Sequence, residues 1–223
     1  MVLAFNKEER EAYDLIRKTS WNDVLDHINF LKRDNITEYV RNHGQEIYFL
    51  ESREDIVNKT YEMVKNSQER VIIKSGDFDH VTDKNADITG DMWLETYREC
   101  VNRLGKENVT IIMHIEGWTE KTARAILETG VNLKHNISDL HAGIVDDYMF
   151  NFYKTRVDEK YVKVVGTPQR QPDKMVYRGY VTNFKPFVAE MKKTIQEIIK
   201  EAEDAEVTLK RIEKLKQEGN NGN

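Results

Sequence analysis

The sequence predicts an α/β fold with a mixed, largely parallel sheet flanked by helices, with further helices at the amino-terminal end and a long helix at the carboxyl-terminal end. Two observations lead to this prediction. Between residues 46 and 145, short apolar runs alternate with segments whose apolar residues recur every three or four positions, which is typical of strands joined by crossover helices. From Val188 to Ile212, apolar residues follow an uninterrupted heptad pattern.

These patterns divide the chain into four segments. We expect a helical appendage over residues 1–44, an α/β domain over residues 45–186, a coiled-coil-like helix over residues 187–218 and a disordered polar tail over residues 219–223. In the first segment, Ser20 and Asp23 resemble a capping box at the start of a helix. Short helices here fit either a helix-turn-helix that contacts DNA or a packing and dimerising appendage. The absence of a basic recognition face favours the appendage.

The α/β segment contains five apolar runs that are consistent with strands. They are Ile47–Leu50, Val71–Lys74, Val109–Ile115, Val131–His135 and a run that begins at His141. Helices are expected between them, with caps at Ser52 and Thr119 and glycine ends at Gly105 and Gly130. The later ladders Met149–Lys154 and Tyr161–Val165 predict antiparallel or edge strands.

The heptad pattern near the carboxyl end predicts one helix of roughly 45 Å, at about 1.5 Å per residue. Its apolar positions step alternately by three and four; they are Val188, Met191, Ile195, Ile198, Ala202, Ala205, Leu209 and Ile212. A stripe of this length exceeds what one small domain covers. We therefore expect it to pair with another helix, either a second copy of the chain, which we favour, or the amino-terminal helices.

Composition limits the possible classes of function. The chain has 223 residues and a net charge of −5, so a basic field over the whole protein for holding nucleic acid is absent. The single cysteine, Cys100, excludes an internal disulfide and a cysteine zinc cluster, and we expect it to be inert packing. The start turns charged too soon for a signal peptide, and no apolar run reaches about 18 residues. A soluble cytoplasmic protein is the expectation.

From about Gln45 to Glu197, the order of elements resembles one half of the phospholipase D superfamily. In that family a strand with the pattern H-x-K supplies a histidine nucleophile and a phosphate-holding lysine, with an acidic residue further on. His141 matches the histidine, and Gly166 and Thr167 in VVGTPQ match the family's Gly-Ser segment. The sequence also resembles related ligand-binding domains of archaeal transcriptional regulators, in which an apolar pair precedes VDD.

The sequence departs from the active pattern at two positions. Gly143 stands where the lysine is expected, and Tyr148 stands at the acidic position, with Asp146 and Asp147 too early. Loss of one electrostatic contact of this kind typically costs on the order of 10²–10³ in rate. Lys134 or Lys163 substitutes only if the fold brings one of them within reach. We therefore predict a catalytically degenerate site.

Candidate ligand-binding residues lie where the strands of a parallel sheet end, the usual place for a site in such a fold. They are Ser75, Asp77, Glu116 and Trp118, with Thr167 and Arg170 from the Gly-Ser-like segment and its following loop. Trp118 is either a stacking platform or an ordinary anchor. The loop around Arg170 is either an anion site or, as we favour, a plain loop. His141 is read first as a hydrogen-bonded residue at the rim of a pocket, with ligand contact and catalysis as alternatives, and His114 as a satisfied core residue.

An acidic loop, SGDFDHVTDKNADITGD, follows the second expected strand. Carboxylates at this spacing can hold calcium or magnesium, but the spacing fails the EF-hand pattern. A solvated loop explains it as well, and we expect neither a metal ion nor a cofactor.

These observations favour a protein that is not an enzyme: a binding or regulatory module with a pocket near His141 for a small-molecule or anionic ligand, which forms a homodimer through its carboxyl-terminal helix. Two alternatives remain. One is a metal-independent phosphodiesterase or nuclease of the phospholipase D class that uses His141 as its nucleophile. The other is a DNA-associated transcriptional regulator that uses the amino-terminal helices.

Overall fold

A computed structural model describes residues 30–76, 78, 81, 88–156 and 175–220 of the chain. The chain divides into two compact units, residues 1–46 with 153–177 and residues 47–152 with 178–223. In the first unit, helix α3 (Phe30–Asn42) is followed closely by Gly44, whose φ of +67° favours glycine. The N–H groups of His43 and Gln45 both donate to the carbonyl of Val40 and close the helix end.

The sheet has eight strands in the spatial order β1-β7-β6-β5-β2-β3-β4-β8. Their bounds are β1 (Ile47–Leu50), β2 (Val71–Lys74), β3 (Val109–Met113), β4 (Asn132–His135), β5 (His141–Val145), β6 (Tyr148–Arg156), β7 (Met175–Thr182) and β8 (Glu203–Asp204). β6 and β7 run through both units. The α/β class and the mixed sheet are as predicted, but the sheet is partly rather than largely parallel.

Among the strand pairs whose register the structure describes, only β2–β3 and β3–β4 are parallel. β5 pairs antiparallel with both β2 and β6, β1 with β7, and β8 with β4. The physical reason lies in the connection between β4 and β5. Residues 136–140 are too few for the crossover that a parallel strand needs, commonly about a dozen residues or more. β5 therefore returns in the opposite direction, on the far side of β2.

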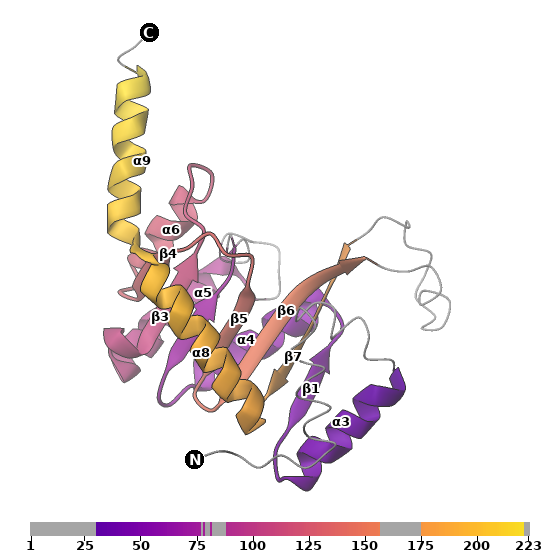
Figure 1. Cartoon of the computed structure of the whole chain (residues 1–223). Helices are drawn as coiled ribbons and strands as arrows, with labels where there is room; N and C mark the ends of the chain where they lie inside the picture. Colours follow the sequence, from indigo (N-terminus) through magenta and orange to yellow (C-terminus); the bar gives the residue numbers. More distant parts are fainter. Residues whose placement is uncertain (1–29, 77, 79–80, 82–87, 157–174, 221–223) are drawn as a thin grey trace. The chain divides into compact units, whose positions relative to one another are not determined.

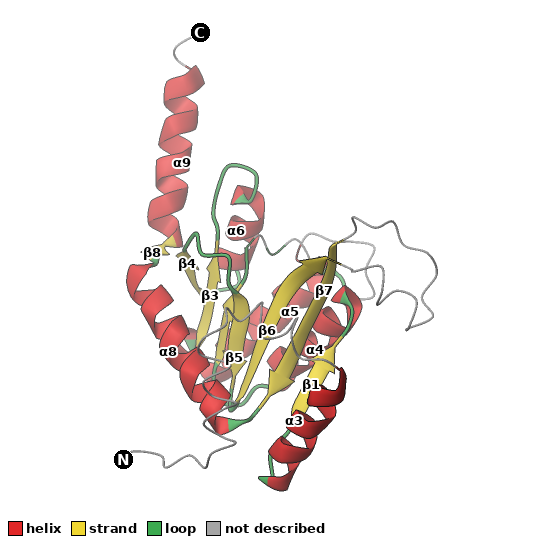
Figure 2. Ribbon diagram, turned by 45° about the vertical axis from the view of Figure 1, so that its right-hand side comes forward, coloured by secondary structure: helices red, strands yellow, loops and turns green. Residues whose placement is uncertain are grey.

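Helices cover both faces of the sheet in the second unit. α8 (Lys185–Glu201) crosses one face, and α4 (Arg53–Asn66) and α5 (Gly90–Leu104) lie on the other (Figures 1 and 2). The predicted cap of α4 is confirmed, since Ser52 Oγ accepts from the N–H of Asp55 at 3.0 Å. Thr89 caps the start of α5 and Gly105 caps its end. The short turn η2 (Lys106–Asn108) then leads into β3.

The core of the second unit includes β3, the middle strand of the parallel part of the sheet. All five residues of β3 are buried, as a strand covered on both faces requires. Cys100 is fully buried on α5, and its thiol donates to the carbonyl of Val64 at 3.2 Å. Burial raises the pKa of this thiol, so the reactive thiolate is disfavoured.

The prediction of one unbroken helix over residues 187–218 is wrong. α8 ends at Glu201, β8 adds two residues to the edge of β4, and α9 (Ala205–Asn220) then begins. At this edge, Lys134 Nζ contacts Asp204 Oδ1 at 2.9 Å. Pairing with β4 satisfies backbone groups of the sheet edge, which a continuous helix would leave open.

The heptad stripe is largely buried within the chain's own second unit. Its most buried members, each at most 6% exposed, are Val188, Met191, Ile195, Ala205 and Leu209. α8 packs on β5, and α9 packs on β4 and on α6 (Glu120–Leu127). Beyond Ile212 the side chains through Glu218 are exposed, including Leu215 at 62%. The regular spacing thus reflects two helices that each bury one face on the same sheet-containing unit.

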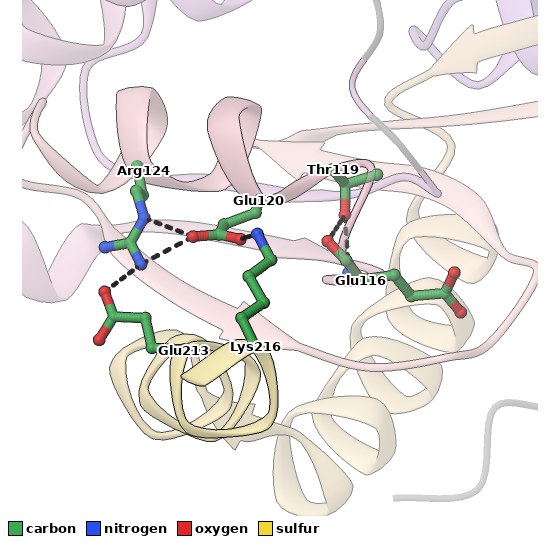
Figure 3. Close-up of polar contacts among 6 residues, drawn as sticks. All are labelled: Glu116, Thr119, Glu120, Arg124, Glu213 and Lys216. Atoms are coloured by element: carbon green, nitrogen blue, oxygen red, sulfur yellow. Dashed lines mark hydrogen bonds and ion pairs between the residues drawn. The ribbon is translucent and has the colours of Figure 1, made fainter. Parts of the chain in front are cut away.

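Charged side chains join α9 to α6 (Figure 3). Arg124 contacts Glu120 at 2.9 Å and Glu213 at 2.6 Å, and Lys216 donates to the second oxygen of Glu120. Hydrogen bonds from Lys216 and Arg124 lower the pKa of Glu120. The first residue of α6 is therefore held by two cations, one of them from the far end of the sequence.

Candidate functional site

The ends of β2 and β3 remain side by side beyond the strands themselves. The N–H of Ser75 donates to the carbonyl of Ile112 at 3.1 Å, and the N–H of His114 donates to the carbonyl of Gly76 at 2.8 Å. The carboxyl ends of parallel strands meet at one edge of the sheet, so the predicted site residues on these strands lie at the same edge.

His141, the first residue of β5, lies against the end of β2. Its Nδ1 is 3.1 Å from the Oγ of Ser75, within hydrogen-bond distance, and the side chain is half-buried. A Cβ atom placed on Gly76 would be 3.4 Å from His141 Cε1, so the imidazole ring packs directly on this glycine. The structure therefore brings His141 against Ser75 and Gly76, which lie at least 65 positions earlier in the sequence.

Gly143 is enclosed by its neighbours in the sheet. A Cβ atom on this residue would lie 2.2 Å from Cζ of Phe150 and 2.5 Å from the backbone oxygen of Ile72. Phe150 is the residue opposite Gly143 on β6, and its ring occupies the space above the glycine. A lysine side chain therefore does not fit at this position as β5 and its neighbours pack here.

Lys74 is the cation that sequence reasoning missed. It is the last residue of β2 and only 1% exposed, and its Nζ donates to the carbonyls of Ser138 at 2.7 Å and Ser75 at 3.2 Å. Burial lowers the pKa of Lys74 to about 8, against the opposing effect of the Asp139 charge. The only hint in the sequence is a lysine that ends the otherwise apolar run VIIK.

A second cluster forms where β3 leads into α6. Glu116 contacts His114 Nε2 at 2.8 Å through one oxygen and accepts from Trp118 Nε1 at 2.9 Å through the other. Thr119 Oγ1 accepts from the N–H of Glu116 (Figure 3). It also donates to the carbonyl of His114. His114, expected to be a core residue, is instead partly exposed, because β3 ends before it and its ring reaches the carboxylate.

Trp118 is 67% exposed, and its indole N–H is held by Glu116. The ring thus presents apolar surface to solvent in a restrained orientation, which fits a platform rather than a partly buried anchor.

His135, at the end of β4, serves the backbone. Its Nδ1 accepts from the N–H of Ile115 at 2.9 Å, which requires the unprotonated nitrogen. Burial, and then the charge of His114, lower the pKa of His135. This histidine is therefore held neutral, with Nδ1 as an acceptor.

Some predicted site residues lie outside the described residues. They are Asp77, Thr167 and Arg170, together with Lys163, the strand expected over Tyr161–Val165 and most aspartates of the acidic loop. Within the described ranges, no group of three or more histidine, cysteine, aspartate or glutamate side chains is placed to hold a metal ion. In the same part of the chain, no helix has the length and apolar character needed to cross a membrane.

The two aspartates after β5 have different environments. Asp146, with φ +52°, forms the tight turn to β6, and its carboxylate accepts from the N–H groups of Gln68, Glu69 and Arg70 at 2.8–3.0 Å. Asp147 is exposed. Asp146 thus fastens the loop between α4 and β2 to the β5–β6 turn.

Replacing Asp146 with alanine is expected to lower the free energy of unfolding by about 2–3 kcal/mol, because three backbone donors lose a charged acceptor and alanine is strained at positive φ. Asp147→Ala is the matched control and should change stability by no more than about 0.5 kcal/mol. Urea unfolding of both variants measures the difference. Equal stability of the two variants would show that the carboxylate of Asp146 contributes nothing.

Sequence comparison matches the chain to no known family and to no curated protein. Similar solved structures include TrmBL2, an archaeal chromatin protein, at 18% identity and a TM-score of 0.48. That match covers 88% of this chain but only 65% of TrmBL2, so the chain spans less than two thirds of its length.

Members of the phospholipase D family are also among the similar structures. Nuc from Salmonella typhimurium is 10% identical with a TM-score of 0.49, over 72% of this chain and 97% of Nuc. NucT from Helicobacter pylori is 12% identical with a TM-score of 0.48, over 72% and 99%. These likenesses concern the fold alone.

Proposed function

We propose that the chain is a binding or regulatory module that holds a small-molecule or anionic ligand beside His141 and does not hydrolyse it. The observation that supports this most directly is the enclosure of Gly143. Phe150 and the backbone of Ile72 leave no room for the cationic side chain that phosphodiester hydrolysis by this type of motif requires.

The buried ammonium of Lys74 does not replace it. The ammonium of Lys74 donates to two backbone carbonyls, and by strand alternation its side chain leaves β2 on the opposite face from Ser75. The imidazole of His141 therefore has a hydroxyl group beside it and glycine backbone beneath it. Such groups donate and accept hydrogen bonds, which suits recognition of a polar ligand, but they offer little stabilisation to a charged transition state.

The first test combines hydrolysis and binding. The wild-type protein is assayed with bis(p-nitrophenyl) phosphate, with and without chelator, beside His141→Ala and the control His43→Ala. His43 contacts the carbonyl of Tyr39 in the first unit. We expect no hydrolysis above the His141→Ala level, and a saturable shift of the His141 imidazole resonance on titration with inorganic phosphate.

Two outcomes would contradict the proposal. Chelator-insensitive hydrolysis that His141→Ala abolishes and His43→Ala preserves would establish the phosphodiesterase alternative. If neither phosphate nor any other anion or polar small molecule shifts the His141 resonance, the chain has no ligand site beside His141.

We further propose that the chain forms a homodimer through the outer half of α9. Most of the heptad stripe is buried within the second unit, but the side chains from Glu213 to Glu218 are exposed. Leu215 is the large apolar side chain among them. Apolar residues on exposed helices commonly contact another helix.

Replacing Leu215 with serine is therefore expected to weaken the dimer at least tenfold in sedimentation equilibrium. Val207→Ser, which changes the other exposed apolar side chain of α9, is the matched control and should leave the dimer constant unchanged. A wild-type protein that sediments as a monomer at all concentrations, or an unchanged dimer in the Leu215 variant, would contradict this arrangement.

A further inference from the structure

The connection between β4 and β5 crosses the end of the parallel part of the sheet. β4 lies beyond β3, and β5 lies on the far side of β2, so residues 136–140 must pass over the carboxyl ends of both β3 and β2. This crossing segment ends at His141. Its course therefore determines where the imidazole enters the site.

The crossing segment is anchored in order along its length. Above β3, the N–H of Asn136 donates to the carbonyl of Met113 at 3.0 Å. The side-chain oxygen of Asn136 then accepts from the N–H of Ser138 at 2.9 Å. Above β2, the carbonyl of Ser138 accepts from Lys74 Nζ at 2.7 Å. The ammonium of Lys74 thus holds the middle of the segment to the end of the strand beneath it.

The same ammonium also reaches the residue that contacts the histidine. Lys74 precedes Ser75 in the chain, and its Nζ donates to the Ser75 carbonyl at 3.2 Å. Ser75 Oγ in turn lies within hydrogen-bond distance of His141 Nδ1. The ammonium of Lys74 therefore contacts the backbone of Ser75 and also the backbone of the crossing segment that leads to His141.

A buried lysine is costly to the fold, because the ammonium loses its hydration. A methionine would fill a similar volume without that cost, but it would leave the carbonyls of Ser138 and Ser75 without this donor. The charge thus serves the placement of the crossing segment rather than the packing of the core.

We propose that Lys74 is a positioning residue that fixes the crossing segment, residues 136–140, and thereby holds His141 in hydrogen-bond contact with Ser75. The consequence for ligand affinity rests on the proposed function, whereas the positioning of the imidazole does not. Lys74 acts through Ser138 and Ser75 and does not touch the ligand.

The test compares Lys74→Met with Lys134→Met, which removes a lysine from β4, two strands away from β2, that contacts Asp204 on the edge strand β8. Imidazole ¹H–¹⁵N spectra report the hydrogen bond at His141 Nδ1, with Ser75→Ala as the reference for its loss. We expect Lys74→Met to stay folded, to shift the Nδ1 resonance to its position in Ser75→Ala, and to speed amide exchange of Ser138 and Asp139 at least tenfold. Lys134→Met should match the wild type. A folded Lys74→Met protein with wild-type Nδ1 position and amide exchange would overturn the proposal.

A measurement on the wild-type protein covers the case in which Lys74→Met does not fold. A scalar coupling from Lys74 Nζ to the carbonyl carbon of Ser138 detects the hydrogen bond itself. Its presence, together with an amide shift at Asp139 that follows the titration of Lys74, supports the proposal; the absence of either overturns it. Among the described residues, the titratable groups near the carboxyl ends of β2, β3 and β4 also include Asp139, Glu116, His114, His135 and His141, and their own titrations are followed in the same spectra.

Phosphate titration separates this proposal from the proposed function. If Lys74→Met shows the expected change at His141, phosphate affinity should fall at least tenfold in that variant and remain unchanged in Lys134→Met. A wild-type protein that binds no phosphate or other ligand would contradict the proposed function, while the Nδ1 resonance would still decide whether Lys74 positions the histidine.

Discussion

Introducing lysine at position 143 is expected to lower the free energy of unfolding by about 3 kcal/mol or more and to restore no hydrolysis. The first side-chain atom alone would lie 2.2 Å from the ring of Phe150 and 2.5 Å from the oxygen of Ile72. Overpacking of a well-packed core typically costs about 1–3 kcal/mol, and a clash with backbone adds to it because a sheet strand cannot move without losing its pairing. Urea unfolding and the phosphodiesterase assay measure the two effects.

Gly117→Ala is the control for this substitution. A Cβ atom there has no neighbour within 4 Å, so its stability should remain within about 0.5 kcal/mol of wild type. Adding Phe150→Ala to Gly143→Lys should recover only part of the loss, since the oxygen of Ile72 remains in the way. A stable Gly143→Lys protein that hydrolyses phosphodiesters would show that the site lacks only the lysine and has room for it. That outcome would contradict the steric account.

The second large effect concerns Lys74 and pH. Its pKa of about 8 in the folded protein lies below the ordinary value of 10.5, so between these values the unfolded chain binds more protons than the folded one. Stability from this group therefore rises with pH across the window from 8 to 10.5, and the penalty of the buried charge is fully present below pH 8. The pKa difference corresponds to about 3 kcal/mol.

Comparison of wild type with Lys74→Met isolates this contribution, because other groups titrate in both proteins. The stability of wild type relative to the variant should increase by roughly 2–3 kcal/mol from pH 7 to pH 10 in urea unfolding. Lys134→Met, which removes a more exposed lysine, should show no such trend. A constant difference between wild type and Lys74→Met would mean that the ammonium is better solvated than its burial indicates.

Local sequence patterns predicted most elements of the second unit, and the exception is the carboxyl-terminal segment, where β8 separates α8 from α9. Runs such as Val71–Lys74 became strands because apolar, β-branched residues suit a buried sheet. Ser52 caps the start of α4 by accepting from the N–H of Asp55, and Gly105, with a φ of +86°, follows the end of α5. These features depend on residues close together in the chain, which is why spacing reveals them.

The candidate site was predicted in part. The carboxyl ends of the strands pointed to Ser75 and His141, and the structure joins them. The hydrogen bonds of Glu116 with His114 and Trp118 require the loop after β3 to fold back on itself, which no spacing indicates. The role of Lys74 was not predicted, because a lysine at a strand end is ordinarily solvated, and its burial and its contact with Ser138 arise only in the folded chain.

Residue spacing predicted most of the helices and strands between residues 47 and 145, and the sequence has glycine where the family pattern has lysine. Spacing did not show that the heptad stripe breaks at β8, that Phe150 fills the space over Gly143 or that Lys74 is buried with its ammonium on the carbonyl of Ser138. Each of these outcomes joins residues distant in sequence, and such contacts depend on the order of strands in the sheet, which local propensity and periodicity do not encode.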